Sequence, residues 1–265
     1  MLDSHCHLAG EEFAPDLHEV AARASEAGVR TALCILAAED APEVARANEV
    51  RAAWGDGLHF ATGIHPHHAG LFAGDMARAV RTVEEALAAS NACAIGEIGL
   101  DYHYDFSPRD VQQEVFRVQI RLALQRDLPI IIHTREATDD TFAILKEEAE
   151  QTGESGRVIR GVFHCFTGDV EMARRALAID FYLSYAGILT FPKADTLRDA
   201  ARITPLDRLL SETDAPYLAP VPFRGKRNEP AYVTRVVQTL ADLHGQTVAA
   251  MGEQIAANFT RLFGR

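Results

Sequence analysis

The sequence predicts an α/β protein of the TIM (β/α)8-barrel class, and three observations support that prediction. Eight short apolar runs recur along the 265 residues, stretches with helical spacing lie between most of them, and no glycine-rich phosphate loop follows the first run. Parallel strands joined by helices form either a closed barrel or an open doubly wound sheet, and the missing Gly-x-Gly-x-x-Gly pattern favours the barrel. We expect one domain covering residues 1–265, a length that is ordinary for this fold.

The predicted strands are short and rich in β-branched and other apolar residues, as buried parallel strands are. In a barrel of this kind the carboxyl ends of the strands open onto one mouth, so the residues that follow each run matter most for function. The predicted strands cover residues 2–5, 29–36, 59–64, 93–98, 130–133, 158–164, 181–184 and 208–211.

The segments between the strands carry apolar residues mostly three and four positions apart, for example across 111–124, which predicts amphipathic helices. Gly28 is placed to end the first helix, and Ser107, followed by a proline, is placed to cap another. The polar segment 151–157 is predicted to be a surface loop, and residues 230–263 are predicted to form helices that close the barrel.

The composition indicates a globular protein of the cytoplasm with no membrane association and no obligatory protein partner. No apolar run is long enough to cross a bilayer, and no targeting segment precedes the first strand. The four cysteines lack a Cys-x-x-Cys spacing, so we expect them to be reduced and buried. A net charge of −12 argues against a broad basic face, so any polyanion must bind through local contacts.

His5 and His7 are separated by one residue at the end of the first predicted strand. Alternate side chains of a strand share a face, so both imidazoles can reach one metal ion from the same side. The alternative is a ragged N-terminus with two exposed histidines.

Four more side chains with metal-ligand chemistry stand where other predicted strands end: Glu97, His133, His164 and Asp214. Each has an ordinary alternative as a hydrogen-bonded residue at the mouth of the barrel or as the partner of an arginine. Their joint arrangement at one mouth favours a shared site. Divalent cations would offset the cost of burying carboxylates close together.

Seven segments in the same order along nearly the whole chain resemble the TatD family of metal-dependent deoxyribonucleases. The resemblance implies a TIM barrel that holds two divalent ions and hydrolyses the phosphodiester bonds of DNA. The segments are Asp3–His7, Gly63–His67, Gly96–Tyr102, Pro129–His133, Phe163–Gly168, Glu212–Pro216 and Arg224–Asn228.

The resemblance also implies a ligand set in which Glu97 bridges the two ions. One ion would be held by His5, His7, Glu97 and Asp214, and the other by Glu97, His133 and His164. Many related barrels use a carboxylated lysine as the bridge, but this chain has lysines only at 146, 193 and 226, in a predicted helix and two loops. Glu97 is therefore the only plausible bridge.

Mixed imidazole and carboxylate ligands suit Zn²⁺, Mn²⁺ or Co²⁺, with Mg²⁺ less natural, so the identity of the metal stays open. Two ions about 3.5–4 Å apart can hold both the attacking and the leaving oxygen of a phosphoryl transfer, and they lower the pKa of bound water to about 7. We therefore expect metal-bound hydroxide as the nucleophile, with Glu97 and Asp214 as catalytic residues and Asp214 as the proton acceptor.

The expected substrate contacts are His65, His67, Tyr102, Arg224 and Lys226. The two histidines can donate to a phosphate, or can simply face solvent from a turn stiffened by proline. The basic pair can bind phosphates, or can belong to a solvated loop. The tyrosine, like the nearby Tyr104 and Phe106, can stack on a base or cover the edge of the core.

These observations, together with the resemblance to the TatD family, predict a two-metal phosphodiesterase that acts on DNA as an exonuclease, at ends or on single strands. One alternative is a binuclear hydrolase of a small phosphoester, a lactone or a cyclic amide, which the net charge of −12 keeps open. The other is a metal-binding scaffold that acts through partners.

Overall fold

The computed structural model describes residues 1–104, 106–151 and 157–264. The predicted polar loop at 151–157 therefore lies largely outside the described residues. Eight strands form one parallel sheet in chain order. Their bounds are β1 (Leu2–Cys6), β2 (Thr31–Ala37), β3 (Leu58–Gly63), β4 (Ala94–Asp101), β5 (Ile130–Arg135), β6 (Gly161–Phe163), β7 (Tyr182–Tyr185) and β8 (Leu209–Ser211).

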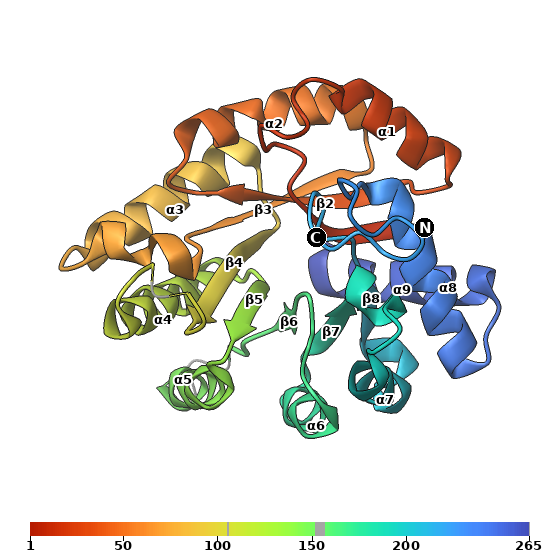
Figure 1. Ribbon diagram of the computed structural model, residues 1–265. Coiled ribbons are helices and arrows are strands. Elements are labelled where there is room, and N and C mark those ends of the chain that lie inside the picture. The colour runs from red at the N-terminus through yellow and green to blue at the C-terminus, as the bar shows by residue number, and fades with distance from the viewer. Residues whose placement is uncertain (105, 152–156, 265) are drawn as a thin grey trace. The chain divides into compact units, whose positions relative to one another are not determined.

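Helices alternate with the strands along the chain, and the colours of Figure 1 follow this alternation from one end to the other. The predicted C-terminal helices are present as the last two. The helices are α1 (Leu17–Glu26), α2 (Ala41–Trp54), α3 (Met76–Ser90), α4 (Arg109–Arg126), α5 (Thr138–Gln151), α6 (Val170–Ala178), α7 (Asp195–Ile203), α8 (Val233–His244) and α9 (Val248–Phe263), with 3-10 turns η1 (Pro66–Phe72), η2 (Gly187–Thr190), η3 (Leu206–Arg208) and η4 (Pro230–Tyr232).

The chain returns from the last strand to the first, which confirms the predicted (β/α)8 barrel. Cys6 forms a parallel bridge with Ala215, directly after β8. The Asp214 N–H donates to the His5 carbonyl at 2.9 Å, and the His7 N–H donates to the Ala215 carbonyl at 2.8 Å. Helix α9 packs across both β1 and β8.

The described residues form two compact units. The first comprises Met1–Ile35, Arg46–His59 and Phe163–Gly264, and the second comprises Leu36–Ala45 and Phe60–Val162. In the first unit, Ala24, Val29 and Val233 form a buried apolar cluster, with Trp54 packed against it. In the second unit, β3 pairs with β4 and β4 with β5.

Side chains at the helix ends explain several boundaries. Asp75, Asp169 and Thr247 each accept a hydrogen bond from a backbone N–H in the first turn of α3, α6 and α9. Gly28 has a φ of 79°, which suits its predicted place after α1. The prediction for Ser107 was wrong, because α4 begins at Arg109 and the serine hydroxyl instead bonds to the η1 segment.

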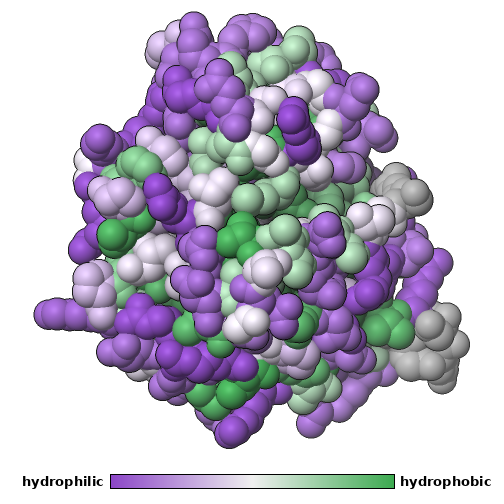
Figure 2. Space-filling model, turned by 90° about the vertical axis from the view of Figure 1, so that its right-hand side faces the viewer, coloured by the Kyte–Doolittle hydropathy of each residue, from purple (hydrophilic) through white to green (hydrophobic). Residues whose placement is uncertain are grey.

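The surface in Figure 2 is mostly hydrophilic, with apolar residues in small groups. Within the described part of the chain, no helix has the length and apolar character needed to span a bilayer.

Gln119 of α4 ties the end of β3 to the helix that packs beside it. Its amide oxygen accepts from the Ile64 N–H at 2.7 Å, and its amide nitrogen donates to the Ile64 carbonyl at 3.1 Å. Gln119→Leu would leave two buried backbone groups without these partners, at about 1–3 kcal/mol each. We expect urea denaturation to show a loss of about 2–4 kcal/mol in the free energy of unfolding.

The control for this prediction is Gln113→Leu. Gln113 also donates hydrogen bonds, to Tyr102 and Asp140, but it is only partly buried, so water can replace the lost partner. Its cost should stay below about 1 kcal/mol. Equal losses for the two variants would contradict the role assigned to Gln119.

Candidate metal centre

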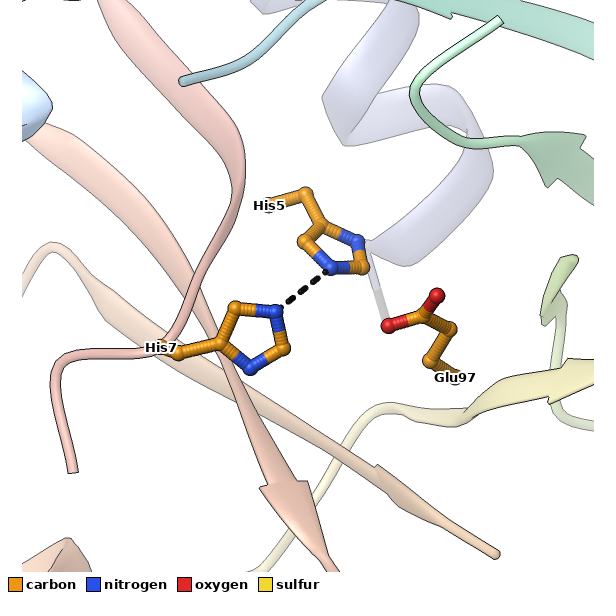
Figure 3. Close-up of side chains that lie close together, drawn as sticks. All are labelled: His5, His7 and Glu97. Atoms are coloured by element: carbon orange, nitrogen blue, oxygen red, sulfur yellow. Dashed lines mark hydrogen bonds between the residues drawn. The ribbon is translucent and has the colours of Figure 1, made fainter. Parts of the chain in front are cut away.

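Four donor side chains lie together at the carboxyl ends of strands in the first unit, and we call them the first donor cluster: His5, His7, His164 and Asp214. Figure 3 shows the two N-terminal rings turned toward one another, with their Nε2 atoms 3.2 Å apart. Asp214 Oδ1 lies 3.7 Å from His5 Nε2 and 3.5 Å from His7 Nε2. The His164 ring stacks on His5 with centroids 3.9 Å apart.

The local pairing of β1 positions its two histidines. The register of β1 against β2 shifts between Asp3 and Cys6, a bulge of the kind that redirects side chains near active sites. Cys6, between the histidines, turns its Sγ toward the Leu33 carbonyl at 3.5 Å. The predicted alternation is therefore present, with both imidazoles on one face and the thiol on the other.

Glu212 fixes the orientation of His164. Its Oε1 accepts from the Cys165 N–H at 2.6 Å and lies 3.3 Å from His164 Nδ1. A carboxylate only accepts, so His164 carries its proton on Nδ1 and keeps the lone pair of Nε2 for a metal.

Asp214 is held in a left-handed backbone conformation, with a φ of 57°. Burial acts to raise the pKa of its carboxyl. The hydrogen bond from His7 and the charges of the nearby histidines act to lower it, and together they outweigh burial, so the pKa of Asp214 lies below its usual value. Asp214 is thus ionised at neutral pH and can serve as a ligand or accept a proton.

A second donor cluster lies in the second unit and consists of His65, Glu97 and His133. His133 Nδ1 lies 2.7 Å from Glu97 Oε1, and His65 Nε2 lies 3.4 Å from the same oxygen. The pairing of β4 with β5 shifts register between Ile95 and Ile98, which is where Glu97 enters the site. Glu97 is 7% exposed, so its carboxylate needs strong partners.

Asp101, the last residue of β4, fixes the protonation of His133. Its Oδ2 lies 3.0 Å from Nε2 of both His67 and His133, and its Oδ1 accepts from the N–H groups of His103 and Tyr104. Burial opposes ionisation of Asp101, but these hydrogen bonds outweigh it and lower its pKa. A neutral His133 that donates from Nε2 to Asp101 would turn the lone pair of Nδ1 toward the Glu97 carboxylate.

This arrangement fits a cation. A neutral His133 that donates to Asp101 has only a lone pair at Nδ1, and Glu97 Oε1 at 2.7 Å is also an acceptor. The Nε2 atoms of His5 and His7 also converge on the Asp214 carboxylate, at 3.7 and 3.5 Å from its Oδ1. Imidazole nitrogens gathered around a buried carboxylate are a ligand set that divalent metals use.

His65 differs from the other candidate metal ligands in its tautomer. Its Nδ1 accepts from the His67 N–H at 3.1 Å, so the neutral ring carries its proton on Nε2, toward Glu97. Desolvation lowers the pKa of His65 to about 4, which keeps the ring neutral. The tautomer makes His65 a hydrogen-bond donor beside the metal ligands, and its predicted contact with substrate stays a prediction.

Asp101→Asn tests the support of His133. The amide cannot accept from two imidazoles as the carboxylate does, so the ligand loses its fixed tautomer. We expect Mn²⁺ affinity, measured by calorimetric titration, to fall about 10–100-fold. Asp140→Asn is the control, because Asp140 accepts from Tyr102 at an exposed position. An unchanged affinity in Asp101→Asn would contradict this assignment.

The other predicted substrate residues have different surroundings. Tyr102 is directed toward α4 and α5, where its hydroxyl donates to Asp140 at 2.7 Å and the Arg109 guanidinium covers its ring. Arg224 lies over the Phe191 ring at 4.3 Å, and Lys226 is exposed. The substrate contacts of these three residues remain predictions.

Asp101 was not among the site residues expected from the sequence. The alternation of side chains along a strand could have identified it. Residues 97, 99 and 101 are expected on one face of β4, so Asp101 lies on the same side as Glu97.

Comparison with known proteins assigns the family. The model for TatD-related DNases matches residues 2–264. The chain belongs to this family. A Bacillus subtilis (strain 168) protein named "uncharacterized metal-dependent hydrolase YabD" is 42% identical over 264 residues, which cover 99% of this chain and 98% of the relative.

Two further TatD relatives are similar over their full length. A Pantoea sp. (strain At-9b) protein named "3'-5' ssDNA/RNA exonuclease TatD" is 34% identical, with 99% of each chain covered. The crystal structure of YjjV, a TatD homologue from Escherichia coli K12, superposes with a TM-score of 0.85 at 29% identity and covers 100% of this chain and 98% of that one. The chain is accordingly a metal-dependent hydrolase of the TatD family.

Proposed function

We propose that this TatD-family hydrolase cleaves phosphodiester bonds of DNA, acting as an exonuclease on single strands or ends with two divalent ions. The observation that most supports the two-metal hypothesis is the presence of two clusters of potential ligand atoms, one around Asp214 and one around Glu97 and His133. The name of the Pantoea relative supports the nucleic-acid substrate.

In this proposal Glu97 would be the ligand common to both ions. His5, His7 and Asp214 would complete the site of one ion, and His133 and His164 would complete the site of the other. Zn²⁺, Mn²⁺, Co²⁺ and Mg²⁺ are all candidates. Divalent ions in such a site polarise the phosphate and make water more acidic.

The protein's own groups would perform the remaining steps. The ionised Asp214 carboxylate accepts a proton from the attacking water. The Nε2–H of His65 points toward the site and can donate to a phosphate oxygen. The exposed Arg224 and Lys226 can contact the backbone of the nucleic acid farther along.

The test combines metal analysis with assays on end-labelled oligonucleotides. Chelated protein, reloaded separately with Mg²⁺, Mn²⁺, Co²⁺ or Zn²⁺, is given single-stranded and duplex DNA as well as a lactone, a cyclic amide and a small phosphate diester. We expect stepwise shortening of single-stranded DNA. Turnover of the small molecules with DNA left intact would replace this proposal by the alternative hydrolase.

A further inference from the structure

We infer that Tyr104 and Phe106 form a shelf that stacks an unpaired nucleobase beside the second donor cluster. The inference deepens the proposed function, and it rests on that function for the identity of the ligand. The two rings lie nearly parallel, with an interplanar angle of 7° and centroids 5.3 Å apart. Phe106 is 67% exposed and Tyr104 is 40% exposed, unusual values for large apolar rings.

The shelf is connected to the donor cluster through His67. The imidazole stands almost perpendicular to both rings, at 5.6 Å from Tyr104 and 4.9 Å from Phe106. His67 also shares the Asp101 carboxylate with His133, at 3.0 Å from each ring. A base on the shelf would therefore place its own phosphates near the metal ligands.

Hydrogen bonds hold the backbone on both sides of the shelf. The Tyr104 N–H donates to Asp101 Oδ1 at 3.1 Å. The Ser107 hydroxyl donates to the His67 carbonyl and accepts from the Gly70 N–H, both at 2.8 Å. An aromatic pair fixed in this way loses little conformational entropy when a ligand binds.

The chemistry of the shelf selects its occupant. Aromatic rings bind other π systems, every nucleobase has a π face, and the more exposed Phe106 ring offers most of the accessible surface of the shelf. The Arg135 guanidinium lies over the Tyr104 ring, 4.7 Å from its centroid, and adds positive charge to the shelf of an otherwise acidic chain. A π surface next to a cation matches a nucleobase and its phosphate. The face of a base is accessible for stacking on protein only when the base is unpaired. We therefore infer that the occupant is single-stranded nucleic acid.

The test measures binding to a variant whose turnover is slowed. The full chain carrying Asp214→Asn is loaded with Mn²⁺ and titrated into fluorescent single-stranded oligothymidylates in which an abasic residue is moved through each position. We expect one position at which loss of the base weakens binding about tenfold, as removal of one stacked base does. Adding Phe106→Ala should abolish that difference, and Phe106→Trp should keep it.

Val158→Ala is the matched control, because Val158 is an exposed apolar residue that precedes β6, at the opposite end of the strands. It should bind like the parent. Two results would overturn the proposed base stacking. One is an affinity of the parent protein that does not depend on the abasic position, and the other is a Phe106→Ala variant that keeps this dependence. A change of oligomeric state in Phe106→Ala with no base dependence would also overturn it, because the rings would then join copies of the chain.

The shelf and the proposed function fail in different ways. If the wild-type protein with any metal cleaves no DNA, but binding still depends on one base and on Phe106, the nuclease proposal alone is wrong. If DNA is cleaved but binding ignores the bases, the shelf alone is wrong.

Discussion

Glu97→Gln should lower the turnover of DNA by about 10³-fold or more. The substitution keeps the shape of the side chain but removes the charge that we propose binds two cations, on a carboxylate that lies 2.7 Å from His133 Nδ1. Stabilisation of transition-state charge by metal ions contributes several kcal/mol, and each 1.36 kcal/mol corresponds to a tenfold change in rate. The measurement is kcat on a single-stranded oligonucleotide, with the metal content of the same sample determined by elemental analysis.

The control for Glu97→Gln is Glu136→Gln. Glu136 lies just after β5 and pairs with His103, but it is 63% exposed and belongs to neither donor cluster. This control should retain wild-type kcat and metal content. Wild-type turnover in a metal-replete Glu97→Gln protein would remove Glu97 from the site.

Asp214→Asn should lower kcat by at least about 10²-fold, the lower range for a lost general base. Asparagine tolerates the left-handed backbone at this position, where φ is 57°, so the change removes charge and proton affinity without the strain that alanine would add. The backbone bonds of Asp214 to His5 and Tyr217 are unaffected by the substitution. The measurement is kcat from steady-state kinetics, and the thermal unfolding temperature checks that the variant is folded.

For Asp214, the informative control is Asp207→Asn. Asp207 is an exposed residue of η3, which precedes β8, and it bonds to Arg208. This variant should be fully active. The assignment of Asp214 fails if Asp214→Asn unfolds at the wild-type temperature, binds metal normally and still turns over DNA at the wild-type rate.

The sequence predicted the fold well because each strand of a barrel is a local apolar run. Every expected run overlaps a strand, and the borders differ by at most three residues, as at β4, where the expected 93–98 became Ala94–Asp101, and at β6, where the expected 158–164 became Gly161–Phe163. The positions of the candidate ligand side chains along the chain were also predictable. They follow strands, and the carboxyl ends of the strands of a (β/α) barrel open onto one mouth whatever the details of packing. The joint ligand set of the two clusters nevertheless stays a proposal.

Features that depend on side-chain direction were harder to predict. The register shifts near His5 and Glu97 come from pairing between strands, which no single segment encodes. Tyr102 and Tyr104 are two residues apart, yet one hydroxyl is bonded to Asp140 on α5 and the other ring stacks on Phe106. Partners supplied by distant elements decide such orientations.

We propose above all that two cations share the carboxylate of Glu97. The most direct measurement is an anomalous difference map, collected at the manganese absorption edge, from crystals grown with Mn²⁺. We predict two peaks about 3.5–4 Å apart, both within coordination distance of Glu97. A single peak, or two peaks of which one lies away from Glu97, would contradict the account.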